Sequence, residues 1–226
     1  MIAALCAKLP GRILVATHRK ELLEQNSGIF KKLSGETPGV YSAGLGRRDF
    51  LDRVIFAGIQ SIHRRIDSLL KSGSFDYFIC DESHLISPPS IDSMYGSVIS
   101  AIGSKTPRIG FTATPYRLSD GPIWGPDPSK TWFDDCPVTI TMQRLTPEYL
   151  SPLVGVRTAA DVDVSNVKTR MGEFVTKELS AAASEESVVS AAIREICELS
   201  QERRSWLLFC VDQTHTKIVT AALTIS

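Results

Sequence analysis

Short apolar runs alternate with longer stretches in which apolar residues recur every three or four positions, most regularly between residues 12 and 111. A short, nearly continuous apolar run is typical of a strand buried on both faces, and the wider spacing is typical of a helix with one buried face. On this basis strands are expected at 12–16, 53–57, 75–80 and 108–111. Helices are expected at 18–33, 62–70 and 91–102. Strands that alternate with helices indicate an α/β fold, with a parallel sheet covered by helices on both faces.

Beyond residue 118 the pattern is less regular. Residues 119–137 are rich in Gly, Pro, Asp and Trp, which is typical of a loop or insertion, and residues 138–142 are expected to form another strand. Residues 151–183 are polar and irregular, so they are expected to form a connector. Three further elements are expected, a helix at 187–199, a buried strand at 205–211 and a helix at 213–223. The pattern therefore predicts that a second α/β unit begins near the end of the sequence.

The composition is that of a globular protein. Of the 226 residues, 43% are hydrophobic and 22% are charged, a balance that argues against a disordered or fibrous chain. This length suffices for one domain, or for one domain and part of another. The 25 Lys and Arg residues balance the 25 Asp and Glu residues, so net charge gives no argument for a nucleic-acid partner. It does not exclude one, because a basic groove can form locally on a neutral protein.

The cysteines and the apolar runs bear on the compartment. The five cysteines are widely spaced and form no C-x-x-C pair, which argues against a disulfide framework or a zinc site and favours a reducing cytosol. No apolar run approaches the ~20 residues that are needed to cross a bilayer. The expected location is therefore cytoplasmic, with no membrane partner.

An acidic pair, Asp81 and Glu82, directly follows the strand expected at 75–80. Ligands gather at the carboxyl ends of parallel strands, and two carboxylates there suit nucleotide hydrolysis. The first can help to hold Mg²⁺, and the second can orient and deprotonate an attacking water. The alternative is a solvated acidic pair that caps the next helix. Ser83 and His84 favour the catalytic interpretation, because Asp-Glu-Ser-His matches the DExH pattern.

A second polar motif, Thr112-Ala113-Thr114-Pro115, follows the strand expected at 108–111. Its two hydroxyls could hydrogen-bond to the acidic motif and report the state of that motif to the rest of the protein. Taken alone, the segment is better explained as a turn that proline ends and threonine caps. The functional interpretation is favoured because the segment follows a DExH motif at a separation of one helix and one strand.

The order of these segments resembles that of superfamily 2 helicases, the DEAD/DEAH-box relatives, in their bacterial and phage branch. The matching segments are 16–22 for motif Ia, 58–61 for motif Ib, 81–84 for motif II, 112–115 for motif III, 205–213 for motif IV and 149–153 for the phage-type region before the second domain. Motifs II and III in this order are specific, whereas the others are weak individually.

The resemblance implies a role for each matching residue. Asp81 would bind Mg²⁺ through water, Glu82 would activate the attacking water, and both would contact ATP together with His84. Coupling of hydrolysis to movement would involve Ser83, His84, Thr112, Ala113 and Thr114. Contact with the sugar-phosphate backbone of a nucleic acid would involve Thr17, His18, Arg19, Gly58, Gln60 and Ser61, a task that suits small side chains at strand ends. Considered alone, residues 18–20 are more simply the solvated first turn of a helix.

Two features depart from the family pattern. Gly58 stands where motif Ib usually has Thr, and no G-x-x-x-x-G-K-S/T loop occurs in the sequence. That loop supplies the amide cradle and the lysine for the nucleotide phosphates. Motifs V and VI are also absent, and residues 1–9 resemble the helix that follows the loop. The sequence therefore resembles an interior slice of a longer protein, and this chain alone is expected to show negligible ATPase activity.

The resemblance also implies an architecture. It predicts a RecA-like first domain at 1–145 without its first strand and P-loop, a connector at 146–184, and the start of a second RecA-like domain at 185–226.

The leading hypothesis for the intact protein is an ATP-dependent helicase or translocase that moves on DNA or RNA, with ATP and Mg²⁺ as cofactors. Single- or double-stranded DNA is the expected partner, RNA is an alternative, and a missing N- or C-terminal part of the same protein is a further one. A second hypothesis is a non-catalytic nucleic-acid-binding remnant or a truncated reading frame. A third is an unrelated α/β metal-dependent hydrolase that uses Asp81, Glu82 and His84.

Overall fold

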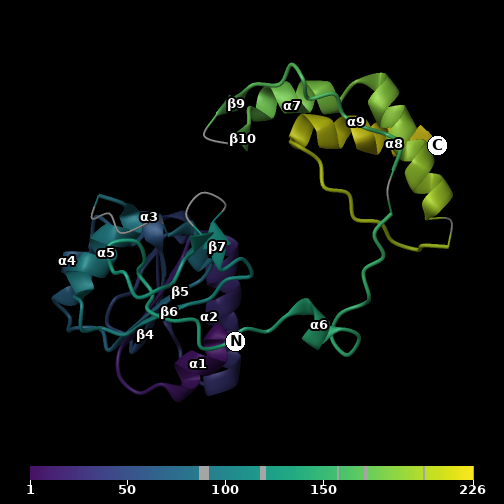
Figure 1. The fold of residues 1–226 in the computed structure, drawn as a ribbon. Coiled ribbons are helices and arrows are strands. Elements are labelled where there is room, and N and C mark those ends of the chain that lie inside the picture. Colours follow the sequence, from purple (N-terminus) through teal and green to yellow (C-terminus); the bar gives the residue numbers. More distant parts are fainter. Residues whose placement is uncertain (87–91, 118–120, 157, 171–172, 201, 226) are drawn as a thin grey trace. The chain divides into compact units, whose positions relative to one another are not determined.

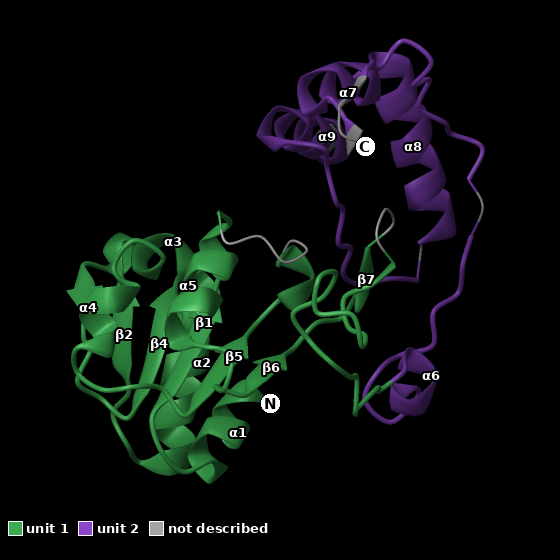
Figure 2. Cartoon of the chain, turned by 60° about the vertical axis from the view of Figure 1, so that its left-hand side comes forward, with its two compact units in different colours: residues 1–140 green, residues 141–226 purple. Residues whose placement is uncertain are grey.

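The computed structural model describes the chain except for residues 87–91, 118–120, 157, 171–172, 201 and 226 (Figure 1). The described chain divides into two compact units, Met1–Ile140 and Thr141–Ser226 (Figure 2). Each unit is described separately below. Among the described residues, no helix combines the length and the apolar character that a membrane crossing requires.

The first unit contains a sheet with the strand order β3-β2-β4-β1-β5-β6. The strands are β1 Ile13–Thr17, β2 Gly39–Ser42, β3 Arg47–Arg48, β4 Val54–Gly58, β5 Tyr77–Cys80 and β6 Arg108–Gly110. All neighbouring strands are parallel except β3, which returns antiparallel to β2 at one edge. The sheet is therefore parallel through its centre, as the buried apolar runs predict.

Helices cover both faces of this sheet (Figure 1). On one face lie α1 (Ile2–Lys8) and α2 (Lys20–Ser34), and on the other lie α3 (Ile59–Ile62), α4 (Ile66–Leu70) and α5 (Met94–Ile102). Side chains of β1 alternate between the two cores, because successive residues of a strand point to opposite faces. Leu14 and Ala16 pack on the α3–α5 side, whereas Ile13 and Val15 pack on the α1–α2 side.

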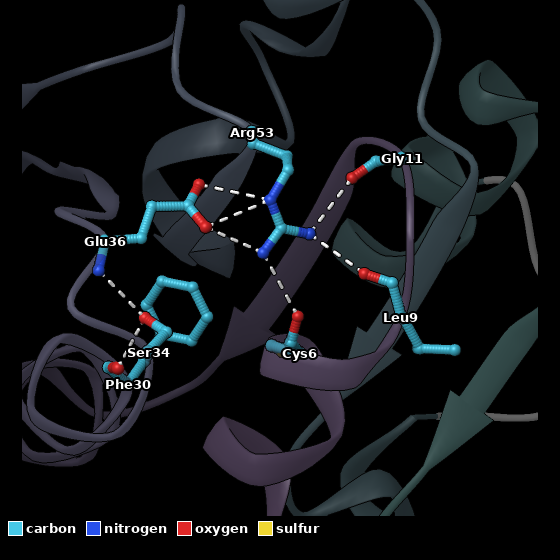
Figure 3. Close-up of polar contacts among 7 residues, drawn as sticks. All are labelled: Cys6, Leu9, Gly11, Phe30, Ser34, Glu36 and Arg53. Atoms are coloured by element: carbon cyan, nitrogen blue, oxygen red, sulfur yellow. Dashed lines mark hydrogen bonds and ion pairs between the residues drawn. The ribbon is translucent and has the colours of Figure 1, made fainter.

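Arg53, at the start of β4, ties three segments together at the amino edge of the sheet (Figure 3). Its guanidinium donates to both carboxylate oxygens of Glu36, at 2.8 to 3.1 Å. It also donates to the carbonyl oxygens of Leu9 at 2.9 Å, Gly11 at 3.3 Å and Cys6 at 3.3 Å. The last carbonyls of a helix have no partner inside the helix, so Arg53 satisfies part of the α1 terminus. It thereby links α1, the turn before β1 and the end of α2.

The remaining elements are short strands and helices. The first unit also holds η1 (Ala43–Leu45), η2 (Ser83–Leu85) and the antiparallel pair β7 (Tyr116–Arg117) and β8 (Gly121–Pro122). The second unit holds α6 (Met142–Leu145), the antiparallel pair β9 (Thr169–Arg170) and β10 (Glu173–Phe174), α7 (Thr176–Ala183), α8 (Glu186–Leu199) and α9 (Gln213–Ile225).

The α/β class and the helix-covered parallel sheet are confirmed. Of the helix expected at 91–102, residue 91 lies outside the described residues, and the rest contains α5. Two expected strands are wrong. Residues 138–141 form no strand, and Thr141 instead caps α6 by accepting from the Arg144 N–H at 3.3 Å. Residues 205–211 also form no strand, and the side chains of Leu207 and Phe209 are 80% and 91% exposed.

The physical reason lies in the surroundings of the 205–211 segment. An apolar run becomes a buried strand only where neighbouring strands offer hydrogen bonds. Within the described residues of the second unit, the only strands are the two-residue β9 and β10. The division after Ile140 lies close to the predicted end of the first domain at 145. That residues 185–226 begin a second RecA-like domain remains a prediction.

Candidate functional site

The candidate residues lie in loops at the carboxyl edge of the sheet. Because β1, β4, β5 and β6 are parallel, the segments that follow them leave at the same edge. The strand register pairs Thr17 with Gly58, Ala16 with Cys80, and Cys80 with Gly110. Motif-like segments that are far apart in the sequence therefore start beside one another at this edge.

The acidic motif is anchored to both neighbouring strands through its backbone. The Asp81 N–H donates to the Ala16 carbonyl at 3.1 Å, and the Ser83 N–H donates to the Phe111 carbonyl at 2.9 Å. Between them, Glu82 has a φ of 51°, in the left-handed region, and is the one non-glycine residue with positive φ among the described residues. This conformation costs about 1 to 2 kcal/mol for a residue with a Cβ.

His84 connects the acidic motif to the threonine motif. Its Nδ1 lies 2.9 Å from Thr112 Oγ1 and 3.3 Å from Glu82 Oε2. Thr112 Oγ1 also accepts from the Thr114 N–H at 3.0 Å, and the His84 carbonyl accepts from Arg117 Nε at 3.3 Å. These contacts join the end of β5 to the segment after β6 and to β7. The structure thus brings together two motifs that lie 28 positions apart in the sequence.

Ser83 does not take part in this network. Its side chain is 1% exposed, and its Oγ has no hydrogen-bond partner among the described residues. It lies against Gly110, where an added Cβ would come within 2.8 Å of both Ser83 Oγ and the Phe133 ring. The close packing explains why β6 ends on glycine. Ala113, the middle residue of the threonine motif, is exposed.

The candidate nucleic-acid residues also gather at this edge, but they differ in exposure. His18, Arg19 and Gln60 are exposed, whereas Thr17 is only 1% exposed and its Oγ1 has no partner among the described residues. The Gln60 side-chain amide donates to the His18 carbonyl at 3.0 Å, which joins the segments after β1 and β4.

The half-buried pair Gly58 and Ser61 completes this set of candidates. Ser61 Oγ accepts from the Ala43 N–H at 2.9 Å, so the turn after β2 also reaches the site. Sequence reasoning missed this turn, because β2 and β3 carry too few apolar residues to be predicted.

Asn26 is a second residue that sequence reasoning missed. Its Nδ2 donates to Asp81 Oδ2 at 3.3 Å, from the middle of α2. The signal in the sequence is a polar residue on the buried face of an amphipathic helix, at the spacing of Leu23 and Phe30. Such an interruption indicates either a solvated edge or a polar partner across the helix.

The acidic site has the donor set for a largely hydrated magnesium ion, which the protein alone would hold weakly and nucleotide phosphates would hold further. Among the described residues, no three His, Cys, Asp or Glu side chains lie close enough together to hold a metal ion. Mg²⁺ keeps several waters and usually needs only one or two carboxylates together with substrate phosphates. The half-buried Asp81 carboxylate fits that requirement.

Cys80, directly before the acidic pair, is a core residue. It is fully buried against the α3–α5 side of the sheet. Burial raises the pKa of the Cys80 thiol well above its usual range, and the nearby Asp81 and Glu82 carboxylates raise it further. The neutral thiol is a poor nucleophile, so Cys80 contributes packing rather than chemistry.

Comparison with known proteins gives a match to one family and matches to solved structures, two of which are described below. The family described as "Type III restriction enzyme, res subunit" matches residues 1–117, just over half of the chain. A crystal structure of the UvsW helicase from bacteriophage T4 matches at 17% identity and a TM-score of 0.39, covering 50% of this chain and 42% of that one. A second structure of T4 UvsW matches at 15% identity and a TM-score of 0.43, covering 99% of this chain and 44% of that one. The chain thus spans less than half the length of either. No curated protein matches it.

Proposed function

The chain belongs to the type III restriction enzyme res subunit family, a group of superfamily 2 helicase type, and from this membership we propose that it serves ATP-dependent helicase or translocase activity on nucleic acid. The observation that supports this most strongly is the contact between the two motifs. His84 Nδ1 lies 2.9 Å from Thr112 Oγ1 while the adjacent Asp81 and Glu82 occupy the same strand end. We propose that this link, from the acidic pair through His84 to the hydroxyl that follows β6, couples hydrolysis to movement.

On the nucleotide side, Asp81 is the residue proposed to hold Mg²⁺ through water, and Glu82 is proposed to orient the attacking water. When bound, the cation would neutralise charge that develops on the transferred phosphoryl group. Glu82 Oε2 is 3.3 Å from His84 Nδ1, so the imidazole can hold this carboxylate in one orientation. Ser83, Ala113 and Thr114 are proposed to transmit the state of the site.

On the nucleic-acid side, the exposed His18, Arg19 and Gln60 are proposed to contact the sugar-phosphate backbone. Contacts to phosphate and sugar carry no sequence information, which suits a protein that moves along a strand. Gly58 and Ser61 would let the strand approach the backbone closely. The buried Thr17 hydroxyl is proposed to act only if this loop opens, because it is 1% exposed. DNA is the proposed partner, with RNA as the alternative, and a further part of the same protein is a proposed intramolecular partner.

Binding of a single strand tests this assignment. Fluorescence anisotropy with a labelled oligothymidylate should detect binding that falls as salt rises, since phosphate contacts release counterions. Arg19→Ala should weaken the affinity by about threefold to tenfold, which corresponds to the loss of one solvent-exposed ion contact of about 1 kcal/mol.

Lys105→Ala is the matched control. Lys105 is also an exposed cation, but it precedes β6 and so lies at the opposite edge of the same sheet. Its removal changes the net charge by the same amount and should leave the affinity within about twofold. An equal loss in both variants would show that only overall charge matters and would refute the proposed surface.

A second candidate function is nucleic-acid binding without hydrolysis. The exposed His18, Arg19 and Gln60 would suffice for it. Steady-state ATP hydrolysis by this chain that is abolished by Glu82→Gln would exclude it.

We propose that the protein is located in the cytoplasm. The five cysteines, which are all free, support this location.

A further inference from the structure

The direction of the Asp81 side chain follows from the alternation of strand β5. Ile79 packs on the α1–α2 side of the sheet, whereas Phe78 and Cys80 pack on the α3–α5 side. Because side chains alternate along a strand, the residue two positions after Ile79 continues toward α2. Asp81 therefore meets α2, and Asn26 is the residue of α2 that it meets.

Asn26 occupies the sheet-facing stripe of α2. Leu23 and Phe30 of this stripe are fully buried, and Ser27 is 9% exposed. Asn26 is three positions after Leu23 and four before Phe30, so it lies on the same face. A half-buried amide at such a position loses hydration, and a partner must compensate for that loss. The described partner is the Asp81 carboxylate.

Each oxygen of the Asp81 carboxylate receives one N–H. Oδ2 accepts from Asn26 Nδ2 at 3.3 Å, and Oδ1 accepts from the Glu82 N–H at 3.1 Å. An ionised carboxylate offers about four acceptor positions, so two remain for a cation or its waters. The two donors fix the plane of the carboxylate and leave its remaining lone pairs free.

We infer that Asn26 is a positioning residue, which holds the Asp81 carboxylate in the orientation that meets a divalent cation. This rests on the proposed function, in which Asp81 is the metal-binding residue. Hydrogen-bond donors to a ligating carboxylate orient it, and their removal typically lowers metal affinity by about 10-fold to 100-fold. The bond reaches from a different element, so it also fixes where α2 lies relative to the end of β5.

Manganese binding tests the inference without nucleotide or nucleic acid. The full chain would be titrated with Mn²⁺, and paramagnetic broadening of the backbone amides around Asp81 would be followed by NMR. Asp81→Asn should abolish the broadening that the wild type shows. Asn26→Ala should weaken binding by about tenfold. Asn26→Asp should tighten it, because it places a second carboxylate beside the first without a change in shape.

Ser27→Ala is the matched control. Ser27 is the next residue of α2 and lies on the same buried face, and its hydroxyl donates to the Glu24 carbonyl of its own helix, at 3.1 Å. It should bind Mn²⁺ as the wild type does. A thermal unfolding curve for each variant separates loss of the fold from loss of the site. If Asn26 had only a structural role, its substitution would lower the unfolding temperature. The Mn²⁺ affinity would then not fall in Asn26→Ala and rise in Asn26→Asp.

The possible outcomes separate the two proposals. Equal Mn²⁺ affinity in wild type, Asn26→Ala and Asn26→Asp would overturn the role of Asn26 while the metal site at Asp81 stands. The absence of any Asp81-dependent broadening in the wild type would overturn both. A loss in Asn26→Ala together with a gain in Asn26→Asp supports the inference, whatever the result of the oligothymidylate assay.

Discussion

At the scale of single residues, Gly11 shows how a backbone position is fixed by its surroundings. Its φ is +79°, and an added Cβ would clash with the Asp76 carboxylate. That carboxylate accepts from the Arg12 N–H at 2.7 Å and so holds the entry of the chain into β1. The position therefore demands glycine for two reasons, its backbone conformation and its contact.

Gly11→Ala should lower the free energy of unfolding by more than 2 kcal/mol, since the left-handed strain of about 1 to 2 kcal/mol is added to a steric clash. Gly35→Ala is the matched variant. Gly35 has a φ of +73° and would meet nothing within 4 Å, so this substitution adds strain alone. Urea denaturation measures both. Equal losses would show that the Asp76 contact has no energetic consequence.

Residues of the site differ in how far the sequence predicted them. Asp81, Glu82 and Thr112 could be predicted because each directly follows a recognisable apolar strand, and parallel strands end at one edge. The contact of Asn26 with Asp81 could not, because it depends on where a helix packs across the sheet. The burial of Thr17 and Ser83 could not be predicted either, since it depends on how neighbouring loops pack over them.

At the scale of elements, the centre of the sheet and its β6 edge were predictable, whereas the opposite edge, formed by β2 and β3, was not. β1, β4 and β5 are buried on both faces, so their apolar runs are unambiguous. β2 has only four residues, and β3 is an exposed Arg-Arg pair, so neither shows a strand pattern. The run at 205–211 has the pattern without the partner strands, and pattern alone does not provide hydrogen bonds.

Arg53 belongs to this scale, because it joins elements rather than neighbours in sequence. Arg53→Met should lower the free energy of unfolding by about 2 to 3 kcal/mol, as hydrogen bonds from a charged donor are lost and helix-end carbonyls are left unsatisfied. Its side chain is 33% exposed, so the ion pair with Glu36 is partly screened, and most of the loss comes from the carbonyl contacts.

Arg47→Met provides the comparison for Arg53. Arg47 also pairs with a carboxylate, Asp49, but its side chain is 50% exposed. Surface pairs of this kind contribute about 0 to 1 kcal/mol. Chemical denaturation of both variants should therefore show a clear difference, and equal effects would contradict the role given to Arg53.

At the scale of the whole molecule, the chain consists of two compact units, and the site lies entirely on the first. The family match covers residues 1–117, the part that holds the sheet and both motifs. The zero net charge leaves nucleic-acid binding to a local surface, and the exposed His18, Arg19 and Gln60 at the carboxyl edge are the residues proposed for it.

The most direct test of the account is an NMR map of where a single strand binds. Backbone amide shifts of the full chain would be recorded with and without an oligothymidylate. We expect the shifts to concentrate in the segments after β1, β4 and β6, around Arg19, Gln60 and Thr114. Shifts confined to the amino edge, around Gly11 and Lys105, or to the second unit would contradict it.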